Sequence, residues 1–160
     1  MIYNMDFLIS AMVILLLILW HFLGEKRAED LNNRVFLFFA VLGTADVVAE
    51  FFSNYYITSY NSDMENAAVI VTTIFYLLQA LLPATFVFYI QTLHEQKIIS
   101  AKKMFISGVP TLVLISVILT NPFTEKLFSF DVTAGYVKGP WYLLMYVSAL
   151  GHFAAALLLI

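Results

Sequence analysis

Five long apolar segments, separated by polar stretches, constrain the fold of this 160-residue sequence more than any other feature. Crossing the hydrocarbon core of a membrane takes about 20 residues in a helix, within a range of about 17–25. The chain is 62% hydrophobic and only 12% charged, whereas soluble domains carry about 25% charged residues. The third segment contains Pro83 and is long enough to tilt or kink. The sequence therefore predicts an all-α, polytopic transmembrane bundle whose five helices cover residues 7–23, 35–56, 67–93, 104–119 and 141–160.

The basic residues are unevenly distributed among the connections between these segments. Six of the eight follow the first or the third segment, namely Lys26, Arg27, Arg34, Lys97, Lys102 and Lys103. Connections rich in Lys and Arg stay on the cytoplasmic side, so we expect the N-terminus to lie outside. The bases follow the first apolar segment instead of preceding it, which favours a retained helix over a cleaved signal peptide.

We expect a single domain over residues 1–160, because no internal repeat and no second type of composition is present. The last helix would run inward and reach Ile160 without a basic or polar flank, so we expect the natural protein to continue; the alternative is a C-terminus flush with the bilayer edge. The outer connection 121–140 is too rich in apolar and aromatic residues for disorder. We expect it to fold back as a lid over the outer end of the bundle.

Two acidic residues stand inside the second apolar segment, where a charge at the bilayer centre costs roughly 2.5–3.5 kcal/mol. Asp46 and Glu50 are four residues apart and share one helical face. No Lys or Arg occurs inside a predicted helix, so the partners must be neutral, and other helices offer Tyr76, Gln79 and His152 at a similar depth. We therefore predict a buried cluster that binds a ligand or responds to protons, or alternatively holds the helices together by hydrogen bonds. Its members are Asp46, Glu50, Tyr76, Gln79 and His152.

Several classes of function are disfavoured by what the sequence lacks. No nucleophile, zinc-protease, redox-cysteine or phosphate-loop motif occurs, so no catalytic residue is predicted. Cysteine is absent, and two carboxylates with one histidine have no defined ligand spacing, so we expect no metal and no cofactor. The net charge of −3 gives no indication of a nucleic-acid partner. The partner that the composition predicts is the lipid bilayer.

Two short motifs flank the outer connection, "TNPF" and "GYVKGPWYLLMY". Their arrangement resembles the N-terminal seven-transmembrane sensor domain of bacterial histidine kinases and GGDEF-type diguanylate cyclases. Those domains typically have Asn-Pro after the fourth helix and Tyr-x-x-Gly-Pro before the fifth. The stretch from Leu15 to Glu50 is also similar to the first two helices of such sensors. The outer-loop residues that carry the resemblance are Asn121, Pro122, Tyr136, Gly139, Pro140 and Trp141.

The resemblance implies a sensory module in the cytoplasmic membrane of a bacterium, of which this chain has the first five helices. It implies an N-terminus outside, an unidentified small-molecule signal, and a cytoplasmic output domain that is absent from this chain. It allows a homodimer formed through that output domain, and it implies no enzymatic activity for these 160 residues. A fragment of a transporter and a structural membrane subunit are the alternatives.

Overall fold

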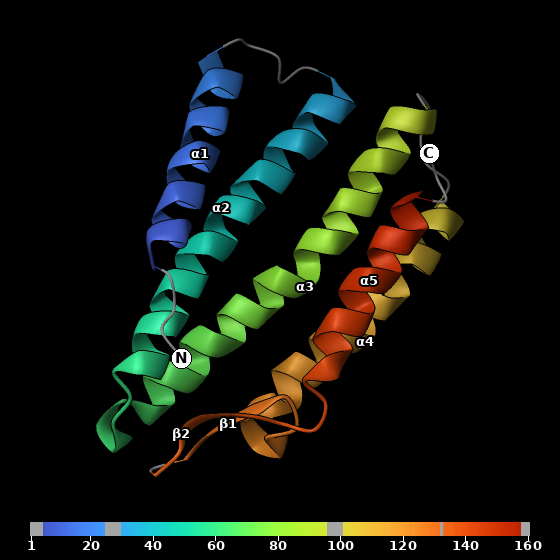
Figure 1. The fold of residues 1–160 in the computed structure, drawn as a ribbon. Helices are drawn as coiled ribbons and strands as arrows, with labels where there is room; N and C mark the ends of the chain where they lie inside the picture. Colours follow the sequence, from blue (N-terminus) through green and yellow to red (C-terminus); the bar gives the residue numbers. More distant parts are fainter. Residues whose placement is uncertain (1–4, 25–29, 96–100, 132, 158–160) are drawn as a thin grey trace.

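A computed structural model describes residues 5–24, 30–95, 101–131 and 133–157. The described residues form five α-helices and one two-stranded antiparallel sheet, which lies at one end of the bundle (Figure 1). The predicted helical bundle with five helices is confirmed. In chain order, the elements are α1 (Met5–Gly24), α2 (Leu31–Thr58), the 3-10 helix η1 (Ser62–Met64), α3 (Glu65–Glu95), α4 (Ala101–Thr124), β1 (Phe128–Asp131), β2 (Gly135–Lys138) and α5 (Leu143–Leu157).

Three of the described helices are long and apolar enough to cross a membrane. Their candidate spans are Phe7–Gly24, Leu31–Thr58 and Glu65–Leu93. The apolar parts of α4 and α5 are shorter. Large side chains on α1 are exposed, including Leu17 at 63% and Trp20 at 81%. Apolar surface of this extent is suited to contact with lipid, so the helices indicate a membrane location.

The first four helices begin before the apolar segments that predicted them. For example, α2 begins at Leu31 instead of residue 35. The preceding residue, Asp30, has an extended backbone (φ −88°, ψ 149°), and its carbonyl oxygen accepts the N–H of Arg34 at 3.0 Å. A helix can extend beyond the hydrocarbon core of the membrane wherever its backbone hydrogen bonds continue. Hydropathy identifies only the part of the helix that lies within that core.

The prediction of a single connecting loop over residues 121–140 is wrong. Residues 121–124 complete α4, and an antiparallel hairpin pairs Phe128 with Lys138 and Asp131 with Gly135. After α4, Glu125 has a φ of 53° and donates its N–H to the carbonyl oxygen of Asn121 at 2.8 Å, which closes the last turn. The predicted fifth helix starts at Leu143 instead of residue 141, and residues 158–160 lie outside the described part.

Helix α3 is the centre of the bundle. It contacts α2, α4 and α5, whereas α1 packs against α2 on the outside of the bundle (Figure 1). A straight helix of 31 residues would be about 46 Å long, well beyond the hydrocarbon thickness. Helix α3 instead bends partway along its length (Figure 1), and Pro83 lies inside it. Proline removes a backbone hydrogen bond and is the usual cause of such a bend.

The hairpin end of the bundle contains a well-packed apolar core. Leu127 and Phe128, just before and at the start of β1, are each only 1% exposed. They fill the space between the ends of α3, α4 and α5, so the segment folds back onto the bundle as predicted. The buried members of this core are Tyr76, Ala80, Leu114, Ile118, Leu127, Phe128 and Met145.

Gly139 allows the chain to pass close to the end of α4. A Cβ atom at this position would clash with the backbone of Lys126 and lie 2.9 Å from the carbonyl oxygen of Glu125. We expect Gly139→Ala to lower the free energy of unfolding by about 1–3 kcal/mol, because backbone atoms cannot move aside as a flexible side chain can. The measurement is unfolding of the 160-residue chain in detergent micelles, followed by circular dichroism.

Gly151→Ala is the matched control for this prediction. No atom lies within 4 Å of a Cβ added at Gly151, and alanine favours a helix by about 1 kcal/mol over glycine. We expect this variant to be at least as stable as the original chain. Equal stability of the two variants would contradict the close approach at Gly139.

Candidate functional site

The side chain of Asn121 fixes the turn that leads from α4 into the hairpin. It is 1% exposed and lies in the last turn of α4. Its Oδ1 accepts the backbone N–H groups of Leu127 at 2.7 Å and Phe128 at 3.3 Å, and its Nδ2 donates to the carbonyl oxygen of Phe128 at 3.0 Å. One side chain therefore pairs with three buried backbone groups, which irregular structure would otherwise leave unsatisfied.

The other motif residues surround the same turn. The N–H of Gly139 donates to the carbonyl oxygen of Leu127, and the N–H of Trp141 donates to that of Lys126, both at 2.8 Å. The exposed motif residues are Pro122, Pro140 and Trp141. The six outer-loop residues that carry the resemblance thus attach the hairpin to α4, and none of these six lines the cavity described below.

Two tyrosines join the hairpin to α3. The hydroxyl oxygens of Tyr76 and Tyr136 are 2.5 Å apart, and the ring centroid of Tyr76 lies 5.3 Å from that of Phe128. Tyr76 is buried in this aromatic core. The prediction that Tyr76 belongs to an acidic cluster is therefore corrected, since its hydroxyl faces the hairpin.

Replacing Asn121 tests whether its side chain holds the turn. We expect Asn121→Ala to lower the free energy of unfolding by about 2–4 kcal/mol, because it leaves buried groups of Leu127 and Phe128 unpaired. The measurement is denaturant unfolding of the chain in micelles. The neighbouring Thr120→Ala is the control, since that exposed hydroxyl donates only to carbonyls of its own helix. A similar loss in both variants would show that Asn121 has no special role.

A single carboxylate organises the tip of the hairpin. The Oδ1 of Asp131 accepts the hydroxyl of Thr133 at 2.5 Å and the N–H groups of Thr133 and Ala134 at 2.8 Å each. These bonds, the hydroxyl bond first, hold the pKa of Asp131 below its ordinary value, because they favour the charged carboxylate. Gly135 follows with a φ of 68°, a conformation that glycine adopts without a steric penalty.

The lowered pKa of Asp131 gives the hairpin tip a defined pH dependence. Its stabilising contribution is complete above the ordinary aspartate pKa of about 3.9 and is lost as the pH falls through the lowered value. We expect Thr133→Val to raise this pKa toward the ordinary value, as measured by NMR titration of the Asp131 carboxyl carbon. Thr124→Val, whose hydroxyl donates to the carbonyl of Thr120, should leave the titration unchanged. An unchanged titration in Thr133→Val would contradict the assignment.

A cavity of about 450 Å³ lies between α2, α3 and α5. Its volume is within the range of about 300–1,000 Å³ that is typical of small-molecule sites. The lining is mostly apolar and includes Pro83, the proline inside α3. The polar residues that line it are Asp46 from α2, Gln79 from α3, Tyr142 just before α5, and Tyr146 and Ser148 from α5.

Asp46 is the unusual residue of this cavity. Its Oδ1 is buried and has no hydrogen-bond partner among the described residues. Glu50, one turn further along α2, adds electrostatic repulsion instead of a counter-charge. The sequence has no Lys or Arg between Arg34 and Lys97. A buried acceptor without a donor costs about 1–3 kcal/mol, so this carboxylate is poorly satisfied where it stands. Because Asp46 lines the cavity, it is the acidic side chain that a donor or cation there would meet.

The structure brings together two of the five predicted cluster residues, Asp46 and Gln79. Glu50 is half-buried and does not line the cavity.

His152 is 4% exposed and faces α4, where its Nε2 lies 2.9 Å from the hydroxyl oxygen of Thr111. Its Nδ1 lies 2.7 Å from the carbonyl oxygen of Ser148. Because a carbonyl can only accept, Nδ1 carries the hydrogen, and a neutral ring then accepts the Thr111 hydroxyl through Nε2.

Buried hydroxyl groups connect the helices at two places. The hydroxyl oxygens of Ser53 and Thr72 are 3.1 Å apart and join α2 to α3, while Thr111 and His152 join α4 to α5. Hydrogen bonds of this kind are common between helices in membranes. The alternative interpretation, that the polar residues hold the helices together, therefore applies to Ser53 and His152 but not to Asp46.

The sequence analysis missed the aromatic part of the cavity. The hydroxyl oxygens of Tyr142 and Tyr146 are 3.4 Å apart, and both rings line the cavity close to Ser148. Their spacing of four residues at the start of the last apolar segment was an available signal. Apolar periodicity alone cannot distinguish cavity-lining phenylalanines from those that face lipid.

The described part of the chain defines a membrane-type helical bundle with a cavity between its helices, and this cavity is lined by Asp46, whose buried Oδ1 has no partner among the described residues. Comparisons with protein-family models, with curated proteins and with solved structures gave no match. The function must therefore be argued from the residues of this chain.

Proposed function

We propose that this chain is the sensory input domain of a bacterial signalling protein, with no catalytic activity of its own. The observation that carries the proposal is the cavity between α2, α3 and α5, which is lined by Asp46, an acid whose buried Oδ1 has no partner among the described residues. Apolar cavities with a few convergent polar groups are the usual form of small-molecule sites. The resemblance of the motifs around the hairpin to seven-transmembrane sensor domains supports the same class.

In this proposal the chain crosses the cytoplasmic membrane five times, with its N-terminus outside. The distribution of basic residues supports this orientation, since six of the eight follow the first or third predicted helix. The N-terminal end of α1 points toward the same end of the bundle as the hairpin (Figure 1). The hairpin would then lie on the outer surface, with Lys126 and Lys138 beside it.

The signal would travel through the bend in α3. Pro83 lines the cavity together with residues of α2 and α5, so a bound molecule contacts the bent part of α3. Such a molecule changes the bend only if it binds two packings with different affinity. Tyr76 fixes the first half of α3 in the hairpin core. A change in the bend therefore moves the second half, which leads to the predicted cytoplasmic connection.

The test replaces the acids of α2 in the intact signalling protein. We expect the output of Asp46→Asn combined with Glu50→Gln to differ about fivefold or more from the original protein, since allosteric coupling is typically about 1–3 kcal/mol. The output is measured as cyclic dinucleotide formed or as kinase autophosphorylation, with expression checked by immunoblot. Asp63→Asn, which removes an exposed carboxylate from η1 outside the cavity, is the control and should have no effect. Unchanged output in the double variant at normal expression would sink the proposal.

The gene itself provides an independent test. The proposal expects the codons after Ile160 to continue in frame toward further helices and a GGDEF or kinase core. A stop codon directly after Ile160 would contradict a relay to an output domain. The buried bonds Ser53–Thr72 and Thr111–His152 would then favour a structural membrane subunit.

A further inference from the structure

The described residues that line the cavity between α2, α3 and α5 include an acidic side chain but no basic one. Asp46 lines it, and no Lys, Arg or His is among its lining residues. The nearby His152 is engaged with Thr111 and the carbonyl oxygen of Ser148. Asp46 also borders a second cavity of about 310 Å³ on the α1 side, where every other lining residue is apolar or glycine. Neither cavity therefore offers Asp46 a positive charge from the described part of the chain.

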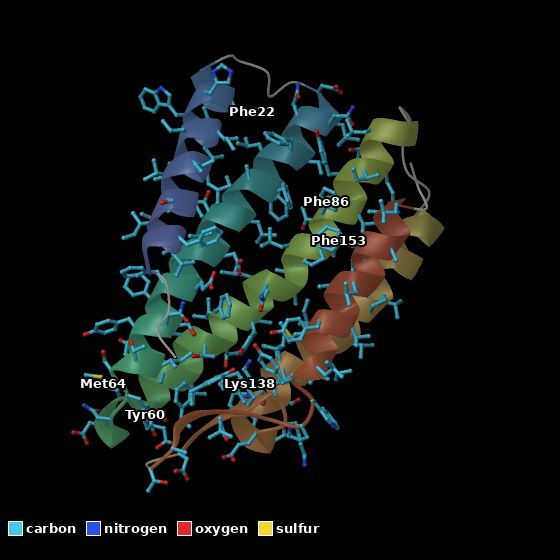
Figure 2. All side chains as sticks on the ribbon, in the orientation of Figure 1. Phe22, Tyr60, Met64, Phe86, Lys138 and Phe153 are labelled. Carbon is cyan, nitrogen blue, oxygen red and sulfur yellow. The ribbon has the colours of Figure 1, made fainter. Side chains whose placement is uncertain are left out.

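The same cavity has an aromatic wall that spans three helices. The ring centroid of Phe86 on α3 lies 6.0 Å from that of Phe39 on α2 and 5.7 Å from that of Phe153 on α5. Figure 2 shows Phe86 and Phe153 close together between their helices, and all three rings line the cavity. The faces of aromatic rings attract cations, most strongly where water is excluded. The wall therefore adds favourable electrostatics for a cation as well as apolar contact.

A cation–π contact is already present at another aromatic residue of the cavity, Tyr142. The Nζ of Lys138, at the end of β2, lies 4.2 Å from the ring centroid of Tyr142. Tyr142 also lines the cavity. The ring that forms part of the cavity wall is thus oriented so that a cation can reach its face from the hairpin.

We propose that this cavity binds a small organic cation, an ammonium group on an aromatic or apolar body, with the charge beside Asp46. The inference rests on the proposed sensory function and names the chemical class of its ligand. A neutral apolar molecule would offer the carboxylate of Asp46 neither a donor nor a positive charge, and an anion would be repelled by Asp46 and Glu50. A metal ion would lack ligands, since the described residues contain no group of three or more that could hold one.

The test uses the 160-residue chain in nanodiscs of zwitterionic lipid, so that the membrane surface does not bind the probe. The probe is benzyltrimethylammonium, which is permanently charged, and the competitor is neopentylbenzene, its neutral isostere. We expect saturable binding of the cation in equilibrium dialysis and poor displacement by the neutral compound. Discrimination between the two compounds by the unmodified chain needs no variant and cannot be attributed to misfolding.

Two variants locate the binding. Asp46→Asn should weaken cation binding about tenfold or more, because Asp46 is the only carboxylate among the described residues that line the cavity. Phe86→Leu should weaken it by about two- to fivefold while the neutral compound is unaffected. Asp63→Asn, which removes an exposed carboxylate outside the cavity, is the charge-matched control and should bind as the original chain does. Thermal unfolding of each variant shows that it is folded.

Three results would overturn the proposal: no saturable binding of the cation, equal binding of the cation and its neutral isostere, or unchanged binding in folded Asp46→Asn. Equal binding would assign the cavity to apolar molecules such as lipid chains. The assay needs no output domain, so its result does not depend on whether the chain relays a signal. An altered output in the acid variants together with no cation binding would reject the ligand class alone.

Discussion

Packing against α3 is the constraint on which the rest of this structure depends. Helices α2, α4 and α5 and strand β1 all contact it, and α1 joins the bundle through α2. Apart from Thr92, its buried residues repeat at intervals of four or seven, which places them along one face of the helix. They are Ala68, Thr72, Tyr76, Ala80, Val87 and Gln91. Small residues at several of these positions let neighbouring helices approach closely, while Tyr76 reaches the hairpin core.

The helices could be predicted because their length is set by the bilayer and their composition by contact with lipid. The hairpin could not, since it depends on two features that hydropathy does not express. Asn121 supplies buried hydrogen bonds to the turn, and Gly139 permits a close backbone approach. The sequence did indicate that this segment is too apolar for disorder, but strands of four residues are too short to give a reliable alternation.

For the candidate site, the sequence could predict the level of each residue along its helix, but not which neighbouring element its side chain faces. The spacing of residues along a helix fixes their level and their common face, which correctly grouped Asp46 with Gln79. It does not fix which neighbour that face meets. Helix α5 turns His152 toward Thr111 of α4, and α3 turns Tyr76 toward the hairpin, because the apolar core between these elements decides their rotation. The position of a face relative to its neighbours is a property of the whole bundle.

The presence of Asp46 is difficult to explain by packing alone. Helices α2 and α3 are already joined by a bond between two neutral hydroxyl groups, Ser53 and Thr72, which carries no cost of burying a charge. The apolar surface of both helices is extensive, so a leucine at position 46 would serve their contact with each other and with lipid. The carboxylate instead lines a cavity together with Pro83 of α3, and one of its oxygens has no partner among the described residues. In the proposed function, a ligand in the cavity supplies the charge or donor that Asp46 lacks, and the free energy released there favours one bend of α3 over another.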